Sequence, residues 1–274
     1  VRCWGSNDLK QLGVEDAAAS RTNPASAPAL LTGATRIAAG NGHTCARLLD
    51  GTVSCWGAAT REQLGRGVEA SETRAVALPV NVVSAVGDLD LSAGFEHTCV
   101  IAPGDRALCF GQNHFGSLGV GAPGAPSYTG VTRVALGAGH SCGLTTGGSV
   151  TCMGGNAEGA LGSPGGDSSV PRPVPGLAGV TRISAGQAHT CVVRTGRVLC
   201  WGLNNFGQLG DGTVEDRATP QEVAMAGEAT DVALGAFHSC ALLRSGAVHC
   251  WRRSTDGQMG DGTSWHRATP GRRA

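Results

Sequence analysis

A triplet of His, then Ser or Thr, then Cys occurs five times in the chain, and a second Cys follows each copy nine or ten residues later. Thiol and imidazole side chains at such a spacing can either form disulfide bonds or bind a zinc ion. A sixth half-copy, Cys3–Gly5, opens the chain. The five full copies are His43–Cys45 with Cys55, His97–Cys99 with Cys109, His140–Cys142 with Cys152, His189–Cys191 with Cys200, and His238–Cys240 with Cys250.

The residues between the two cysteines of each copy predict a β-hairpin. In the first copy, residues 49–51 (Leu-Asp-Gly) form a three-residue turn whose Gly can take a left-handed backbone. That register places Cys45 directly opposite Cys55. The fourth copy is one residue shorter and turns at Thr195-Gly196, yet Cys191 still faces Cys200. Because the loop length varies while the pairing holds, the Cys pairing is the constraint.

Cysteines directly opposite each other on paired strands have the close approach that a disulfide needs. Each bond would close a loop of about ten residues, worth about 2–3 kcal/mol in the chain-entropy model. The alternative is a metal site, since His43, Cys45 and Cys55 share one face, but no fourth ligand is obvious. We expect five structural disulfides and an unpaired Cys3, and the paired residues are Cys45, Cys55, Cys99, Cys109, Cys142, Cys152, Cys191, Cys200, Cys240 and Cys250.

The spacing of the triplets predicts the fold class. Successive histidines are 54, 43, 49 and 49 residues apart, a period typical of repeat arrays and propellers. Each unit begins with a short apolar strand ending in Gly, such as Ile183–Gly186, and both faces of the following hairpin are apolar or small. Strands buried on both faces belong in stacked or radially packed sheets. We therefore expect an all-β propeller rather than a linear β-solenoid.

The repeat also resembles a known family. Residues 186–210 carry the pattern Gly-x-x-His-Thr-Cys, then Gly-x-Val-x-Cys-Trp-Gly-x-Asn-x-x-Gly-Gln-Leu-Gly. This pattern is similar to the repeat of the regulator of chromosome condensation (RCC1-type) family. The resemblance covers essentially the whole chain and implies one propeller domain over residues 1–274, usually of about seven blades with about four strands each. The added Cys pairs resemble the secreted bacterial branch of that family.

The repeat count predicts an incomplete ring. Five full repeats and one partial repeat are present, so we expect a fragment of a seven-bladed propeller from which about one or two blades are missing. The partner of Cys3 is then expected before Val1. A closed ring of five or six blades is the alternative.

Several motifs could suggest catalysis or metal binding, and each has a simpler structural interpretation. A His needed in every repeat is a packing residue, expected to lie buried and neutral beside a backbone carbonyl, and its Ser or Thr neighbour is a strand residue that is able to bond locally. Residues 139–143 match Gly-x-Ser-x-Gly, but they fall in a strand rather than at a strand-to-helix turn. Asp211–Thr213 and Asp261–Thr263 lack the alternating carboxylates of a calcium loop, so Asp-Gly turns are expected.

The net charge and the amino-acid composition exclude further classes of function. The formal net charge is +0, without the basic excess typical of nucleic-acid binders. No apolar run is long enough to span a membrane. Paired cysteines indicate an extracellular, cell-surface or periplasmic setting. We therefore expect a non-catalytic scaffold without metal or cofactor, which binds a protein or cell-surface partner through the irregular segments Arg66–Asn81, Val120–Gly130 and Ser163–Gly176.

Two other functions are the alternatives to a scaffold. The resemblance implies guanine-nucleotide exchange on a small GTPase as the main alternative, although no segment matches an exchange wedge. Residues 259–265 are similar to an Asp-box of sialidases, which use a tyrosine nucleophile and an arginine cluster. Tyr128 is the only tyrosine and lies in a Gly/Pro-rich segment, which disfavours that third interpretation.

Overall fold

The computed structural model describes residues 1–14, 20–26, 33–65, 74–84, 90–119, 127–252 and 267–272, and it is built almost entirely of β-strands. One short 3-10 helix, η1 (His114–Gly116), is the exception among these residues. The strands are β1 (Arg2–Ser6), β2 (Ser20–Ser26), β3 (Ala34–Ala39), β4 (His43–Leu48), β5 (Thr52–Gly57), β6 (Arg74–Ser84), β7 (Leu91–Ala93), β8 (His97–Ala102), β9 (Arg106–Gly111), β10 (Tyr128–Thr129), β11 (Val131–Leu136), β12 (His140–Thr145), β13 (Val150–Gly154), β14 (Ser168–Pro173), β15 (Val180–Ala185), β16 (His189–Arg194), β17 (Arg197–Gly202), β18 (Arg217–Glu222), β19 (Ala229–Leu234), β20 (Ser239–Leu243), β21 (Val248–Arg252) and β22 (Arg267–Arg272).

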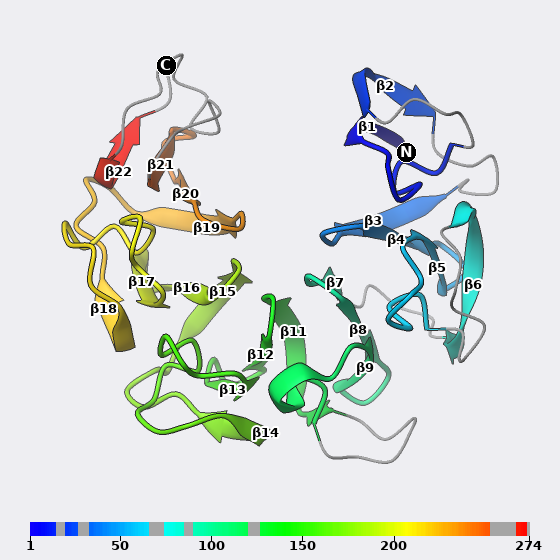
Figure 1. The fold of residues 1–274 in the computed structure, drawn as a ribbon. Coiled ribbons are helices and arrows are strands. Elements are labelled where there is room, and N and C mark those ends of the chain that lie inside the picture. Colours follow the sequence, from blue (N-terminus) through cyan, green and yellow to red (C-terminus); the bar gives the residue numbers. More distant parts are fainter. Residues whose placement is uncertain are drawn as a thin grey trace. The chain divides into compact units, whose positions relative to one another are not determined.

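The described strands form five four-stranded antiparallel sheets and one two-stranded sheet (Figure 1). In each sheet, strands that are consecutive in the sequence lie side by side, which is the arrangement of a propeller blade. We call them the first to fifth blades, and β1–β2 the half-blade. The blades are β3–β6, β7–β10, β11–β14, β15–β18 and β19–β22. The predicted all-β class and the four strands per blade are confirmed.

The chain divides into two compact units, which are described separately below. The first unit comprises residues 1–113 and 120–134, and holds the half-blade and the first and second blades. The second comprises residues 114–119 and 135–274, with the fourth and fifth blades and most of the third. The boundary falls within β11. No described residue belongs to a helix long and apolar enough to cross a membrane.

The hairpin register predicted from the sequence is confirmed in all five blades. Cys45 lies opposite Cys55, and Cys191 lies opposite Cys200 despite the shorter turn. Gly51 has φ 85°, while Thr195 and Gly196 have φ 49° and 79°. Left-handed backbone at both central residues is what a two-residue hairpin turn requires. The remaining pairs also face each other, at Cys99–Cys109, Cys142–Cys152 and Cys240–Cys250.

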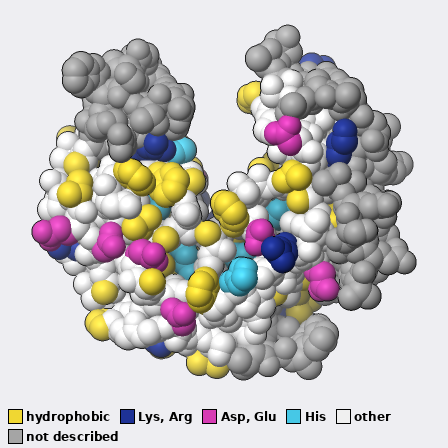
Figure 2. All heavy atoms as spheres, in the orientation of Figure 1, with side chains coloured by type: hydrophobic (Ala, Val, Ile, Leu, Met, Phe, Trp, Pro, Cys, Tyr) yellow, Lys and Arg dark blue, Asp and Glu magenta, His cyan; other side chains and the backbone are white. Residues whose placement is uncertain are grey.

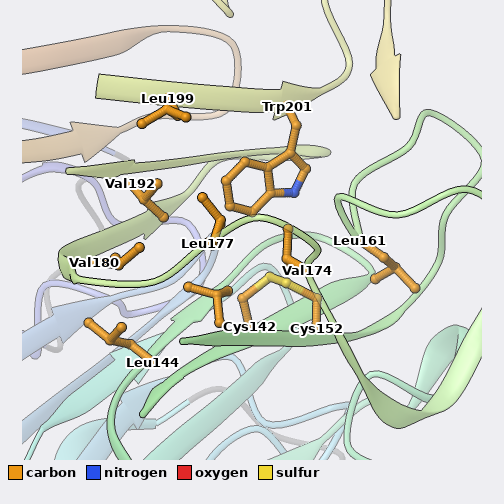
Figure 3. Close-up of a cluster of buried hydrophobic side chains, with 11 residues drawn as sticks. Cys142, Leu144, Cys152, Leu161, Val174, Leu177, Val180, Val192, Leu199 and Trp201 are labelled. Carbon is orange, nitrogen blue, oxygen red and sulfur yellow. A yellow bond between two sulfur atoms is a disulfide. The ribbon is translucent and has the colours of Figure 1, made fainter. Parts of the chain in front are cut away.

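The core of the second unit lies between consecutive blades. Figure 3 shows the Cys142–Cys152 pair and Leu144 of the third blade beneath Val192 and Trp201 of the fourth. Trp201 and both cysteines are fully buried, and Leu144 is only 3% exposed. Burying one such apolar side chain contributes about 1.5–3 kcal/mol. The hairpin of the fourth blade therefore gives one face to the third blade and the other to the fifth blade.

The fifth blade departs from the prediction that both hairpin faces are buried. Ala241, Leu243 and Trp251 pack against the fourth blade. On the opposite face, Leu242 is 41% exposed and Val248 is half-buried. The hairpin of the fifth blade has apolar residues on both faces, like the other hairpins. The greater exposure of Leu242 and Val248 therefore arises from what packs against their face and not from the sequence of the hairpin.

Candidate functional site

The structure joins the ten expected cysteines in five hairpin disulfides. The Cα atoms of each pair lie 4.1 Å apart, and eight of the ten side chains are essentially inaccessible, whereas Cys109 and Cys240 are half-buried. Cys3 in β1 is a free thiol, whose pKa is raised by partial burial against a smaller opposing effect of the N-terminal amine. Within the described part of the chain, no group of three or more His, Cys, Asp or Glu side chains could hold a metal ion.

The recurring histidine bonds to the next blade, which the sequence did not reveal. In the first unit, His43 Nε2 lies 2.8 Å from Thr98 Oγ1, and that hydroxyl donates to the backbone oxygen of Gln63 at 2.9 Å. Because the threonine proton is committed to Gln63, His43 must donate from Nε2 and leave Nδ1 unprotonated. The histidine is buried, as expected, but its hydrogen-bond partner is a hydroxyl of the next blade rather than a backbone carbonyl. The Thr98 hydroxyl bonds to Gln63, which is 35 residues away, rather than locally.

The second unit repeats this arrangement. His189 Nε2 lies 3.1 Å from Ser239 Oγ, and Ser239 donates to the backbone oxygen of Gln208 at 2.8 Å. His140 Nε2 likewise lies 2.9 Å from Thr190 Oγ1. Each bond joins a histidine to the hydroxyl that belongs to the triplet of the following blade. The triplet is thus an inter-blade connector.

Burial keeps these histidines neutral. Burial, reinforced by His97, lowers the pKa of His43 to about 4. Complete burial, with smaller effects of His140 and His238, lowers the pKa of His189 to about 3. The Nδ1 atoms of His43 and His189 have no hydrogen-bond partner. A buried imidazole with no carboxylate beside it is poorly suited to carry a proton in catalysis.

The Trp that follows the second Cys shares the acceptor of the triplet hydroxyl. Trp251 Nε1 donates to the backbone oxygen of Gln208 at 2.8 Å, the atom that also accepts from Ser239. In the first unit, Trp56 and Thr44 converge in the same way on the backbone oxygen of Gln11. The recurring Gln-Leu-Gly loop therefore provides the docking point for the next blade.

The glycine of that loop makes room for the indole. A Cβ added at Gly210 would lie 2.6 Å from Trp251 Nε1, and at Gly162 it would lie 2.8 Å from Trp201 Nε1. Both glycines also have positive φ, 75° and 68°. The Gly recurs because the following Trp and the left-handed backbone both exclude a side chain.

The asparagine of each loop, where described, fixes the loop itself. In the fourth blade, buried Asn204 accepts from the backbone N–H of Leu209 and donates to Asp211 and Thr213. Asp211 also accepts from Thr213 and Arg217. Partial burial acts to raise the pKa of Asp211, but these hydrogen bonds outweigh it and lower the pKa. The carboxylate is saturated by its own loop, in agreement with the predicted turn.

The other sequence motifs that could suggest catalysis do not form a catalytic site within the described residues. Ser141 is buried inside β12 and donates to the backbone oxygen of Ser117, as a strand residue rather than a nucleophile at a turn. Tyr128 is 2% exposed in β10. The Asp-box-like residues 259–265 and Asp261–Thr263 lie outside the described residues.

The surface candidates are the irregular segments between blades. Much of Arg66–Asn81 and Val120–Gly130 lies outside the described residues, whereas Ser163–Gly176 is described and exposes Val170 to 53%. Phe115 lies outside the segments predicted from the sequence, yet it is 61% exposed and has φ 56°, an uncommon backbone conformation for a bulky residue. Figure 2 shows charged, histidine and hydrophobic side chains intermingled over the described part of the visible face, without a concentrated basic patch.

Comparison with known proteins identifies the class. The RCC1-like domain model matches residues 1–273, so the chain belongs to the RCC1-like domain family. A 123-residue stretch is 32% identical to the human probable E3 ubiquitin-protein ligase HERC6, covering 43% of this chain and 12% of that protein. The chain thus matches a small part of that relative's length.

Solved structures share the fold. Prp20p of Saccharomyces cerevisiae is 19% identical with a TM-score of 0.84, over 99% of this chain and 72% of that one. Human WBSCR16 is 22% identical with a TM-score of 0.83, over 99% and 77%. The ectodomain of the Physcomitrella patens receptor kinase CR4 is 20% identical with a TM-score of 0.51, over 80% and 50%. These likenesses confirm the predicted RCC1-type propeller.

Proposed function

We propose that the protein is a non-catalytic interaction scaffold, which presents a variable inter-blade surface on an internal framework that recurs from blade to blade. One observation carries the proposal: three kinds of polar group that recur in several of the described repeats make their hydrogen bonds within and between blades. The triplet hydroxyl, the indole and the loop asparagine all bond internally. What remains for a ligand are the parts that differ between blades, such as Val170 and Phe115.

Relatives with this fold support a protein partner. Prp20p has binding properties to Gsp1p and to histones, and yeast RCC1 has been solved with Kap60 bound. These partners belong to those proteins, but they show that an RCC1-type propeller offers surfaces for other proteins. A rigid frame with divergent loops is the usual basis for such recognition.

We place the scaffold outside the reducing cytosol, at a cell surface, in a periplasm or in an extracellular medium. Five hairpin disulfides support this setting because thiols remain reduced in the cytosol. Intact mass before and after reduction is the test, and we expect a gain of about two hydrogens for each disulfide. A protein purified from its native source with all thiols reduced would contradict the placement.

The binding proposal is tested by capture from the native cell surface or medium, followed by affinity measurement. Charge introduced at the exposed Val170 (Val170→Asp) or truncation of Phe115 (Phe115→Ala) should weaken a partner bound through these surfaces, by about tenfold or more. Leu49→Asp, at a 76% exposed hairpin turn, is the matched control. A folded protein that captures nothing and turns over a substrate would refute the scaffold.

Guanine-nucleotide exchange is the alternative, and the likeness to Prp20p favours keeping it. It is separated from the scaffold by measuring nucleotide release from candidate small GTPases in the presence and absence of the protein. We expect no acceleration, since no segment of the chain matches an exchange wedge. Acceleration above the spontaneous rate would replace the scaffold with the exchange factor.

A further inference from the structure

The third strand of the second blade is less covered than its counterparts in the other blades. Leu108, Cys109, Phe110 and Gly111 of β9 are all half-buried. In the fourth blade, the corresponding residues Leu199–Gly202 of β17 are all buried. Because side chains alternate between the two faces of a strand, the exposure in β9 affects both faces. Its cause therefore lies at the edge of the sheet and not on one face.

The outer strand explains this exposure. In the second blade, β10 pairs with Arg106 and Ala107, at the start of β9. In the fourth blade, β18 continues further along β17 and places Gln221 opposite Cys200. The first, third and fifth blades likewise have an outer-strand residue opposite the second Cys of the hairpin. Of these five cysteines, Cys109 alone has no outer-strand residue opposite it among those that the structure describes.

The uncovered edge is the side from which a thiol can attack the Cys99–Cys109 disulfide. A thiolate attacks one sulfur of a disulfide in line with the S–S bond, opposite the sulfur that leaves. Cys99 and Cys109 face each other across β8 and β9, so the in-line approach to Cys109 comes from the outer edge of β9. The approach to Cys99 is blocked, because Cys99 is fully buried and Ser92 of β7 lies opposite it.

We propose that the Cys99–Cys109 disulfide is a thiol-exchange site, which a low-molecular-weight thiol opens while the other disulfide of the first unit stays closed. The attacking thiolate forms a bond to Cys109 Sγ, the S–S bond breaks, and its electron pair leaves with Cys99 Sγ, which takes a proton from water. A second thiol then attacks the mixed disulfide, so that two thiols are oxidised to one disulfide and both cysteines are reduced. This inference requires the hairpin disulfide but does not depend on the scaffold function.

The Cys45–Cys55 disulfide of the first unit is a matched internal control. Both bonds have a sequence separation of 10, and both pairs have Cα atoms 4.1 Å apart. Cys45 and Cys55 are fully buried, and Leu78 of β6 lies opposite Cys55. The two disulfides therefore differ in access and not in loop length or strand pairing.

Cys240 of the fifth blade is half-buried as well, but its strand has neighbours on both sides. Ala233 of β19 lies opposite Cys240 on the side away from Cys250. Gly271 of β22 lies in the corresponding place beside Cys250. Partial exposure of a disulfide is therefore not sufficient, because the in-line approach must also be uncovered.

The experiment uses the folded, oxidised 274-residue chain and reduced glutathione as the thiol. Iodoacetamide traps each released cysteine, and trypsin cleaves after Arg106, which separates Cys99 from Cys109 for mass spectrometry. We expect the Cys99–Cys109 disulfide to open at least about tenfold faster than Cys45–Cys55. Trapped intermediates should carry glutathione on Cys109 and the alkyl group on Cys99. Equal rates for the two disulfides, or glutathione found on Cys99, would overturn the proposal.

Two controls separate direct attack from unfolding and from the free thiol of the chain. The rate should rise in proportion to the glutathione concentration, and a rate that levels off would overturn the proposal, because unfolding of the blade would then limit the reaction. A Cys3→Ser variant should keep the ratio of the two rates, since the attacking thiol comes from solution. A ratio near one in this variant would assign the attack to Cys3 and would also overturn the proposal.

Discussion

The third and fifth blades are built from nearly the same hairpin, yet the same positions have different surroundings. Cys142, Leu144 and Val150 of the third blade are buried beneath the fourth, while Leu242 of the fifth is 41% exposed. Leu144 and Leu242 both lie two residues after the first Cys of their hairpin. The difference shows that the repeat encodes an interface between blades. A single blade cannot bury all of its own apolar side chains, because one face of its hairpin is covered only by a neighbouring blade. Stability should therefore depend on interfaces rather than on single blades.

The largest expected effect concerns the Trp that crosses such an interface. Trp201→Ala should destabilise the second unit by about 3–5 kcal/mol, because it leaves a cavity and removes the bond to the backbone oxygen of Ala160. Trp4 of the half-blade stands in the same Cys-Trp-Gly context but is 64% exposed. Trp4→Ala should change the free energy of unfolding by less than about 1 kcal/mol. Denaturant titration of both variants makes the measurement, and equal losses would contradict the comparison.

The two leucines test the same contrast within one unit. Leu144→Ala should cost about 2–5 kcal/mol, since the side chain is 3% exposed among the third and fourth blades. Leu242→Ala should cost less than about 1 kcal/mol, because much of its surface already contacts water. Thermal unfolding monitored by circular dichroism gives both values. A Leu242→Ala loss as large as that of Leu144→Ala would mean that its face is covered in solution.

The contrast between blades also shows where sequence reasoning succeeds. Hairpin register was predictable because it depends on local spacing, as the change from a three-residue turn to Thr195-Gly196 demonstrates. The disulfide partners follow from that register. The half-exposed face of the fifth blade was not predicted, because periodicity records which residues are apolar and not what packs on them.

The inter-blade bonds were beyond sequence reasoning for a related reason. His43 reaches Thr98, which is 55 residues away, and Thr98 reaches the backbone of Gln63. Local chemistry suggested backbone carbonyls for the histidines and local partners for the hydroxyls. Both expectations fail because stacking of successive blades brings together groups that are distant in the chain. The recurrence of His, Ser or Thr, Gln and Trp at one period was the available signal, and it was interpreted only as packing.

Acidification should weaken these bonds. The pKa of His43 is about 4 in the folded protein, below an ordinary value of about 6.5, so the unfolded chain binds the proton more tightly. The stabilisation is complete above pH 6.5 and falls as the pH drops toward 4, by up to about 3 kcal/mol for this residue. His189 should extend the loss toward pH 3.

Unfolding free energies measured from pH 7 to pH 4 test this expectation. His189→Gln should flatten the pH dependence, since the second unit then loses a group that must be neutral to stay buried. Val214→Gln, at a 62% exposed position without a titrating group, should leave the slope unchanged. If the stability of the wild-type protein instead increased as the pH fell from 6.5 to 4, the histidines would be charged in the folded state.

The smallest effect should come from the hydroxyl between two blades. Ser239→Ala removes the group that contacts His189 and donates to Gln208, and should cost about 1–3 kcal/mol because His189 Nε2 is left buried without this partner. Ser239→Thr should retain most of the stability, since Thr98 and Thr190 fill the same role in other blades. Ser245→Ala, in an exposed turn, is the control. If Ser239→Ala and Ser245→Ala were equally mild, the triplet would be a packing motif alone, and its hydroxyl would not help to hold successive blades together.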